Sequence, residues 1–343
     1  MIRHAFITVT DCDFFPGTLA TVGSVAEFQP DADIFVINNE KRPLTAPQVA
    51  YLRTHPGIWL LDSSRLALDG RYIGPWELKA YAADELAPGY EVIVGIDSDC
   101  LLCSSVEAEL QRCLETGGFL GGRDGDGADY DDSYRVYGIR TPARNPRYMS
   151  TSLLFCAVTV ANQRLLRKWA HACSTAIFNG RGPYPGHGDQ GVLNALLYAE
   201  NRTTDVHLLD NLLWSQHWTH WNSKIDYRDG TFVNQSARNQ PQRAFHCGGC
   251  EKYWEKCHSD RVHASQGSQV YPYAWFLAML WFGPCRNWSV DPCEYLPPSS
   301  HHLLTDLSTF LPQVLQVYPR ARVLWEGQRP PPCLQGVGCP AVL

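Results

Sequence analysis

The stretch Glu91-Val-Ile-Val-Gly-Ile-Asp97-Ser98-Asp99 is an apolar segment that ends in two carboxylates two residues apart. Its composition predicts a buried β-strand. Because side chains alternate along an extended chain, Asp97 and Asp99 should project to the same side where the strand stops. Carboxylate oxygens are ligands that divalent cations prefer, and open α/β sheets bind ligands at such strand ends. The stretch therefore predicts a metal site that could hold a diphosphate.

An Asp-x-Asp pair is common, and a structural turn is the alternative interpretation. Four further pairs occur in the chain: Asp11-Cys-Asp13, Asp31-Ala-Asp33, Asp124-Gly-Asp126 and Asp129-Tyr-Asp131. Most of these are expected to be solvated loop or turn residues. The pair at Asp97 differs because it follows a buried-type strand and precedes the apolar Leu101-Leu102 and a helix-like run over 104–114. That context favours the metal site.

Strand and helix patterns alternate through the first two-thirds of the chain. The predicted strands cover residues 4–10, 32–38, 57–61, 91–96, 117–122, 148–160 and 244–246. The predicted helices cover residues 18–28, 46–54, 76–86, 104–114, 163–178 and 189–200. This alternation predicts an α/β fold with a mostly parallel central sheet flanked by helices.

The pattern changes near residue 265, so we expect one catalytic domain over 1–265 and a C-terminal extension over 266–343. The extension is rich in aromatic residues and proline. Its aromatic cluster, from Tyr271 to Trp281, could stack on sugars, but the spacing favours core packing or domain contact.

Composition excludes several classes of protein. The chain has 343 residues and a net charge of -6, which gives no electrostatic footprint for nucleic acid or an anionic membrane. The first residues lack a secretory signal pattern, and the apolar segment 274–282 is about half the length that a membrane-spanning helix needs. Thirteen cysteines, an odd number, favour reduced thiols. These features predict a cytoplasmic protein.

A second motif, His246-Cys-Gly-Gly249-Cys-Glu-Lys252-Tyr-Trp254, supplies groups that the two aspartates lack. The imidazole of His246 is a suitable third ligand for manganese, and Gly249 lets the backbone approach a phosphate closely. Lys252 adds a point charge for a diphosphate oxygen. The alternative interpretations are that His246 is a core histidine and that Lys252 is a solvated surface lysine.

The cysteines near both motifs offer a third interpretation. The pairs Cys100-x-x-Cys103 and Cys247-x-x-Cys250 could in principle combine into a four-thiolate zinc site. Zinc ribbons usually space their pairs more closely, so this interpretation is the weaker one.

Together the two motifs resemble those of the GT-A fold glycosyltransferases, particularly the retaining family 8 type that includes glycogenin and bacterial lipopolysaccharide galactosyltransferases. The family's His-x-x-Gly-x-x-Lys pattern is complete at His246, Gly249 and Lys252, and it follows Asp97-x-Asp99 at a family-like distance. The resemblance covers roughly residues 1 to 260.

The resemblance also implies roles for other residues in the same order along the chain. Asp189 and Gln190 would hold donor-sugar hydroxyls near the reacting carbon, although Asp189 could instead cap its helix. The remaining donor contacts implied by the family are Thr8, Val9, Thr10, Asp11, Lys79, Ser98 and Ser152. The chain departs from the family pattern where Ser152 replaces a glycine and Tyr253 replaces a proline.

The activity implied by the resemblance is transfer of a sugar, with retention, from a UDP-sugar to an acceptor hydroxyl. Mn²⁺ or Mg²⁺ would be held by Asp97, Asp99 and His246. The sequence leaves the acceptor open, a glycan among the candidates. Two alternatives remain: a non-catalytic nucleotide-sugar or glycan-binding module, and a sugar nucleotidyltransferase. The latter should show a Gly-rich phosphate loop near its N-terminus, where the chain has only Pro16-Gly17.

Overall fold

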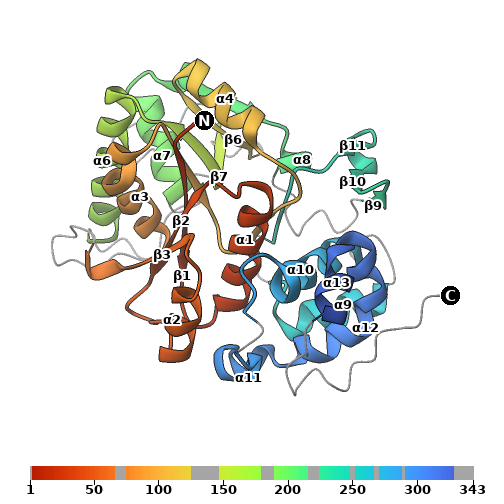
Figure 1. Ribbon diagram of the computed structural model, residues 1–343. Coiled ribbons are helices and arrows are strands. Elements are labelled where there is room, and N and C mark those ends of the chain that lie inside the picture. Colours follow the sequence, from red (N-terminus) through yellow and green to blue (C-terminus); the bar gives the residue numbers. More distant parts are fainter. Residues whose placement is uncertain are drawn as a thin grey trace.

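The computed structural model describes residues 2–65, 75–124, 147–178, 189–214, 224–247, 252–265, 270–287 and 290–327. A seven-stranded sheet forms its centre, with the strand order β3-β2-β1-β4-β7-β6-β8 (Figure 1). The strands of this sheet are β1 (His4–Thr10), β2 (Asp33–Asn38), β3 (Ile58–Asp62), β4 (Val92–Ile96), β6 (Phe119–Arg123), β7 (Met149–Ala157) and β8 (Val206–Leu209).

The sheet is parallel except at one strand. β1 pairs in parallel with β2 and β4, β2 with β3, and β6 with β8, whereas β7 runs antiparallel to both β4 and β6. The other six strands therefore share one direction and end at one edge of the sheet. The predicted α/β fold with a mostly parallel central sheet is confirmed.

Two small sheets lie outside the central one. The first joins β5 (Cys100–Leu102) to β12 (Ala244–His246), and the second contains β9 (Ile225–Arg228), β10 (Thr231–Asn234) and β11 (Gln240–Pro241). The β5–β12 pair is antiparallel and brings the two sequence motifs together.

Helices cover both faces of the central sheet (Figure 1). On one face, α3 (Pro75–Leu86), α6 (Val160–Phe178) and α7 (Asp189–Ala199) pack in a core with Ile7 and Ile93 of the sheet. On the other face, α1 (Phe15–Phe28) packs in a second core with Phe6 and Val94. Alternate residues of β1 and β4 thus enter opposite cores, as the period of a strand requires.

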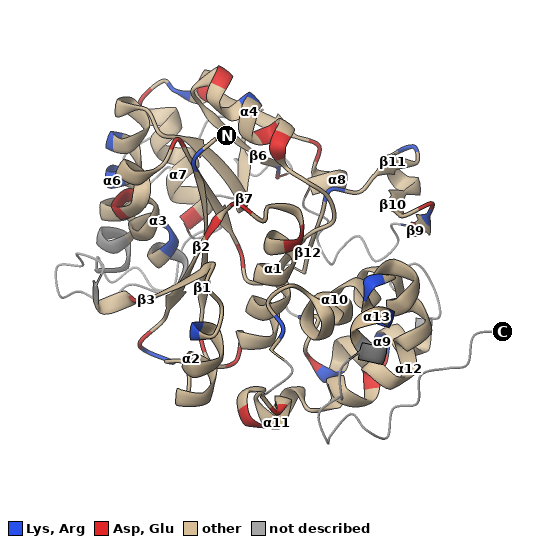
Figure 2. Cartoon of the chain, viewed as in Figure 1, with Lys and Arg blue, Asp and Glu red and all other residues tan. Residues whose placement is uncertain are grey.

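The remaining helices are short or lie toward the C-terminus. They are α2 (Ala46–Arg53), α4 (Glu107–Thr116), α8 (Asn211–Trp214), α9 (Lys256–Ser265), α10 (Val270–Phe282), α11 (Pro292–Tyr295), α12 (His302–Val317) and α13 (Arg320–Gly327). Basic and acidic residues are interspersed along the elements in Figure 2.

The aromatic helix α10 belongs to the core. Its residues from Pro272 to Phe282 are buried, and the helix packs against α1 and α12. The indole Nε1 of Trp275 donates to the carbonyl oxygen of Leu102 over 2.9 Å, which ties α10 to β5. The interpretation of this cluster as core is therefore confirmed, while the domain boundary near residue 265 stays a prediction. No helix in the described ranges is long and apolar enough to cross a bilayer.

Local sequence signals explain where several elements begin. The side chains and backbone amides of Thr45 and Gln48 form a reciprocal capping box at the start of α2. α1 begins at Phe15, earlier than the predicted Thr18, with Pro16 in its first turn. A proline is accepted there because the first helical amides have no intrahelical acceptor.

Candidate metal and donor site

Asp97 and Asp99 lie in a tight turn at the edge where the parallel strands end. Asp97 follows β4 directly, its amide donates to the carbonyl oxygen of Ser152 over 2.8 Å, and its carbonyl accepts from the amide of Cys100 over 2.9 Å. The turn is therefore fixed by β7 on one side and by the start of β5 on the other. The side chain of Asp97 is 37% exposed and that of Asp99 only 6%.

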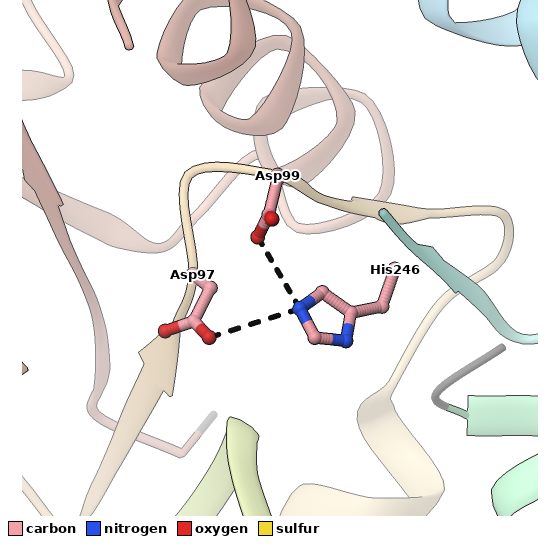
Figure 3. A group of neighbouring side chains, drawn as sticks. All are labelled: Asp97, Asp99 and His246. Atoms are coloured by element: carbon pink, nitrogen blue, oxygen red, sulfur yellow. Dashed lines mark ion pairs between the residues drawn. The ribbon is translucent and has the colours of Figure 1, made fainter. Parts of the chain in front are cut away.

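His246 reaches the two aspartates through the β5–β12 pair. His246 lies opposite Cys100 in the register, and the amide of Cys247 donates to the carbonyl oxygen of Asp99 over 3.0 Å. The imidazole Nε2 is 3.3 Å from Asp99 Oδ1 and 3.8 Å from Asp97 Oδ2 (Figure 3). The structure thus contains the predicted meeting of the three side chains.

The three ligand atoms have the spacing of a metal site. One atom each from Asp97, Asp99 and His246 lie within 4.8 Å of one another, and this is the one such His/Cys/Asp/Glu group in the described part of the chain. Two carboxylates and an imidazole suit Mn²⁺, and carboxylates alone suit Mg²⁺. The donor set fits the cofactor that the sequence predicts.

Two lysines hold the outer oxygens of the carboxylates. The Nζ of Lys79 donates to Asp97 Oδ1 over 2.7 Å, and the Nζ of Lys252 forms a short hydrogen bond to Asp99 Oδ2. Lys252 also donates to the carbonyl oxygen of Cys247 over 3.0 Å. Each carboxylate therefore has one oxygen on a lysine and the other directed toward His246.

The charges in this cluster shift the pKa values of Asp99 and of the two residues that it contacts, His246 and Lys252. Burial alone would raise the pKa of Asp99, but His246 and Lys252 outweigh it and hold that pKa well below its usual range. Burial lowers the pKa of His246 and of Lys252, but the charge of Asp99, its hydrogen bond and the charge of Asp97 together outweigh burial, so both pKa values are raised. Asp99 is thus an ionised carboxylate in the folded protein.

Lys79 is an internal counter-ion. Its side chain is 5% exposed, and its Nζ lies 3.3 Å from Asp189 Oδ2 in addition to the bond to Asp97. Burial lowers the pKa of Lys79, but the charges of Asp189 and Asp97 raise it above the usual value. The stem of the lysine passes over Gly95, where a Cβ would lie 3.2 Å from its Cδ. The glycine in the strand therefore makes room for this lysine.

Asp189 and Gln190 begin α7 and face the same edge of the sheet. Thr151 Oγ1 donates to Asp189 Oδ2 over 3.2 Å, and the Thr151 amide donates to Gln190 Oε1 over 3.2 Å. The indole of Trp169 donates to the carbonyl oxygen of Asp189 over 2.8 Å. Burial raises the pKa of Asp189, while Lys79 acts in the opposite direction. The structure thus links both predicted catalytic residues to the metal group through Lys79 and Thr151.

Two residues that sequence reasoning did not select take part in this network. Thr151 contributes its hydroxyl, its amide and its carbonyl oxygen, which accepts from Lys79 over 2.8 Å. Asp124 Oδ2 accepts from Gln190 Nε2 over 2.6 Å. The sequence predicted a solvated loop residue at Asp124 and did not predict this bond. Asp124 directly follows β6, so the strand-end argument that selected Asp97 could also have selected it.

The other predicted donor contacts lie at the same edge but are engaged locally. Thr10 Oγ1 accepts from the hydroxyl of Thr18 over 2.6 Å, and Asp11 Oδ1 accepts from the amides of Asp13 and Phe14 over 3.0 Å each. Thr8 is buried and Val9 is half-buried. These bonds direct the Thr10 and Asp11 side chains toward the start of α1.

Ser98 and Ser152 are backbone neighbours of the metal group. A Cβ at Gly17 would lie 2.5 Å from the carbonyl oxygen of Ser98, so the Asp97–Asp99 turn packs directly on α1. The carbonyl of Ser152 accepts from the Asp97 amide, and its hydroxyl is 2.9 Å from that of Ser150. Gly249 lies outside the described residues.

The surroundings of the thiols near the motifs disfavour the thiolate form. Burial raises the pKa of the thiols of Cys100, Cys103 and Cys247 well above its usual value. A metal-binding cysteine is a thiolate, which such burial disfavours. Cys250, the fourth member of the zinc alternative, lies outside the described residues.

Comparison with known proteins gives matches at the level of structure. No family model matches the chain, and no curated protein sequence does. The structure is similar to that of the bifunctional glycosyltransferase WbbM in its apo form, with a TM-score of 0.57 and 12% identity over 82% of this chain. The chain spans 50% of the length of WbbM.

A second solved structure is matched over nearly its whole length. The galactosyltransferase LgtC, solved in complex with donor and acceptor sugar analogues, has a TM-score of 0.52 and 14% identity, over 80% of this chain and 95% of LgtC. At these identities the similarity concerns the fold. The chain has the GT-A fold of glycosyltransferases, as the sequence motifs predict.

Proposed function

We propose that the protein is a metal-dependent glycosyltransferase that moves a hexose from a UDP-sugar to an acceptor hydroxyl with retention. The observation that carries the proposal is the convergence of Asp97, Asp99 and His246 at the edge where the parallel strands of the GT-A fold end. Ligands of open α/β sheets bind at that edge.

The charges around the metal group suit the binding of a diphosphate. Mn²⁺ or Mg²⁺ held by the three ligands would neutralise the charge that develops on the departing diphosphate. Lys252, beside Asp99, places a fixed positive charge next to the same position. Preorganised charges of this kind stabilise a leaving group most where water is excluded.

The sugar side of the site is formed by the start of α7. Asp189 and Gln190 are buried at 4% and 7% exposure, and both are fixed by Thr151. Their oxygens are suited to bind sugar hydroxyls and to stabilise positive charge at the anomeric carbon. In a retaining transfer without a protein nucleophile, the acceptor hydroxyl attacks from the face that the diphosphate leaves.

The donor is proposed to be a UDP-sugar because of the family resemblance and the metal group, and the acceptor a glycan or another hydroxyl compound. The cytoplasm is the proposed compartment, since thirteen cysteines, an odd number, favour reduced thiols.

A UDP-release assay tests the proposal. The wild-type protein is incubated with a panel of UDP-sugars and Mn²⁺, with and without EDTA, and with candidate acceptor sugars. Metal-dependent release of UDP that increases with an acceptor supports transfer. UDP-sugar binding without release indicates a non-catalytic module, and release of pyrophosphate from UTP and a sugar phosphate indicates a nucleotidyltransferase. Asp97→Ala should abolish release, while Asp31→Ala, at an exposed aspartate far from the metal group in sequence, should not.

A further inference from the structure

The side-chain amide of Gln190 is held in one orientation by two partners of opposite kind. Its Oε1 accepts from the Thr151 amide over 3.2 Å, and its Nε2 donates to Asp124 Oδ2 over 2.6 Å. A backbone amide only donates, and an ionised carboxylate only accepts. The amide oxygen must therefore face Thr151 and the amide nitrogen must face Asp124, so a flipped side chain would lose both bonds.

The topology places Asp124 at this point. β6 and β7 are antiparallel with Arg123 opposite Met149, and the amide of Asp124 donates to the carbonyl oxygen of Tyr148 over 3.3 Å, so Asp124 lies beside the residue that precedes β7, three positions before Thr151. α7 packs against β7 and brings Gln190 to the same place. Asp124 is half-buried, whereas Gln190 is buried. The carboxylate thus stands on the outer side of the amide.

The bond to Asp124 also affects the charge on the amide oxygen. A hydrogen bond to an ionised acceptor is short and strong, and the 2.6 Å distance agrees with this. An amide whose N–H donates to an anion carries more negative charge on its carbonyl oxygen, because hydrogen bonds in a chain polarise one another. The same oxygen accepts from the Thr151 amide over 3.2 Å.

We propose that Asp124 is a positioning residue that orients and polarises the carboxamide of Gln190 for sugar transfer. The inference rests on the proposed function and deepens it: the Gln190 oxygen is the atom that meets the positive charge of the anomeric carbon, and Asp124 increases its negative charge through the amide. Asp124 keeps its charge throughout and transfers no proton. This role is distinct from those of the metal group, since Asp124 is bonded to Gln190.

Steady-state kinetics of four variants test this role: Asp124→Asn, Asp124→Ala, Gln190→Ala and the double variant of Asp124→Ala with Gln190→Ala. Asparagine keeps an oxygen that can accept from Gln190 but lacks the charge, and alanine lacks both. We expect Asp124→Ala to lower kcat on the order of tenfold and Asp124→Asn to lower it less, with the donor KM within about twofold of wild type. Asp31→Ala serves as the control.

The double variant separates action through Gln190 from independent action. If Asp124 acts through the amide, the double variant is no slower than Gln190→Ala alone, because the second change removes nothing further. Multiplicative losses in the double variant, or an unchanged kcat in Asp124→Ala, would overturn the inference. Thermal shift with Mn²⁺ and UDP verifies that each variant is folded and binds the nucleotide as wild type does. Wild-type protein that turns over no UDP-sugar would overturn the proposed function, and the inference with it.

Discussion

Lys79 donates to Oδ1 of Asp97 over 2.7 Å, while Oδ2 of the same carboxylate faces His246 at 3.8 Å. Lys252 holds the outer oxygen of Asp99 in the same manner. The two lysines thus fix which oxygen of each aspartate points toward the position of the cation. They also neutralise a site that would otherwise concentrate negative charge in a buried place.

Replacement of Lys79 by methionine tests the role of the buried ammonium. Lys79→Met leaves Asp189 buried without its cation, so we expect a loss of about 3–5 kcal/mol in the free energy of unfolding. Adding Asp189→Asn removes the unpaired charge and should recover part of that loss. Urea denaturation of both variants measures the effect. Lys168→Met is the matched control, because the side chain of Lys168, which pairs with Glu200, is 59% exposed, and exposed pairs contribute about 1 kcal/mol or less. Additive losses in the double variant would count against the pairing.

A methyl group at Gly17 should disturb the Asp97–Asp99 turn. A Cβ there would overlap the ring of Trp254 and lie 2.5 Å from the carbonyl oxygen of Ser98. We expect Gly17→Ala to destabilise the fold by about 1–3 kcal/mol and to weaken Mn²⁺ binding, since the overpacked turn must shift. Gly57→Ala places a methyl group in open space and should have little effect on either. Equal Mn²⁺ affinity in the two variants, measured by calorimetry, would show that the turn is not held by this contact.

His258 makes stability depend on pH. Burial, with a smaller effect of Arg261, lowers the pKa of this histidine to about 3. The unfolded chain binds the proton near pH 6.5, so stability is present above that pH and is lost as the pH falls toward the folded-state value. Between pH 7 and pH 5 the loss from this group is about 2 kcal/mol. In His258→Phe, whose ring fits between Tyr253 and Tyr273, urea denaturation should show a smaller loss over the same range. An identical loss in both proteins would rule the histidine out as the cause.

Six of the seven strands of the central sheet were predicted from their apolar sequences, whereas β8 (Val206–Leu209) was not among the predicted strands. The strand over His4–Thr10 was predicted with the bounds that the structure has, and the buried run before Asp97 became β4. Local signals placed the ends less well: α6 begins at Val160, where the sequence pattern predicted strand, because β7 ends at Ala157. Hydrophobic periodicity identifies an element, while its ends depend on backbone bonds that the pattern does not contain.

The candidate site could be predicted only for residues that belong to motifs with a recognisable chemical role. Asp97, Asp99 and His246 stand in recognisable motifs, and the structure brings them together. Their meeting depends on the register of β5 against β12, a long-range pairing that the sequence does not specify. Thr151 was missed because its contribution is partly through its backbone, and Asp124 because its partner Gln190 lies on a distant helix.

Calorimetric titration of Mn²⁺ in the presence of UDP tests most directly whether Asp99 and His246 hold one cation. The titration compares the wild-type protein with Asp99→Ala, His246→Ala and Asp31→Ala. One ion should bind the wild type and the Asp31→Ala control with equal affinity. The Asp99→Ala and His246→Ala variants should bind Mn²⁺ about tenfold more weakly, or weaker still. If the His246→Ala variant and the Asp99→Ala variant each bound Mn²⁺ with wild-type affinity, this result would contradict the proposal that these side chains hold one cation.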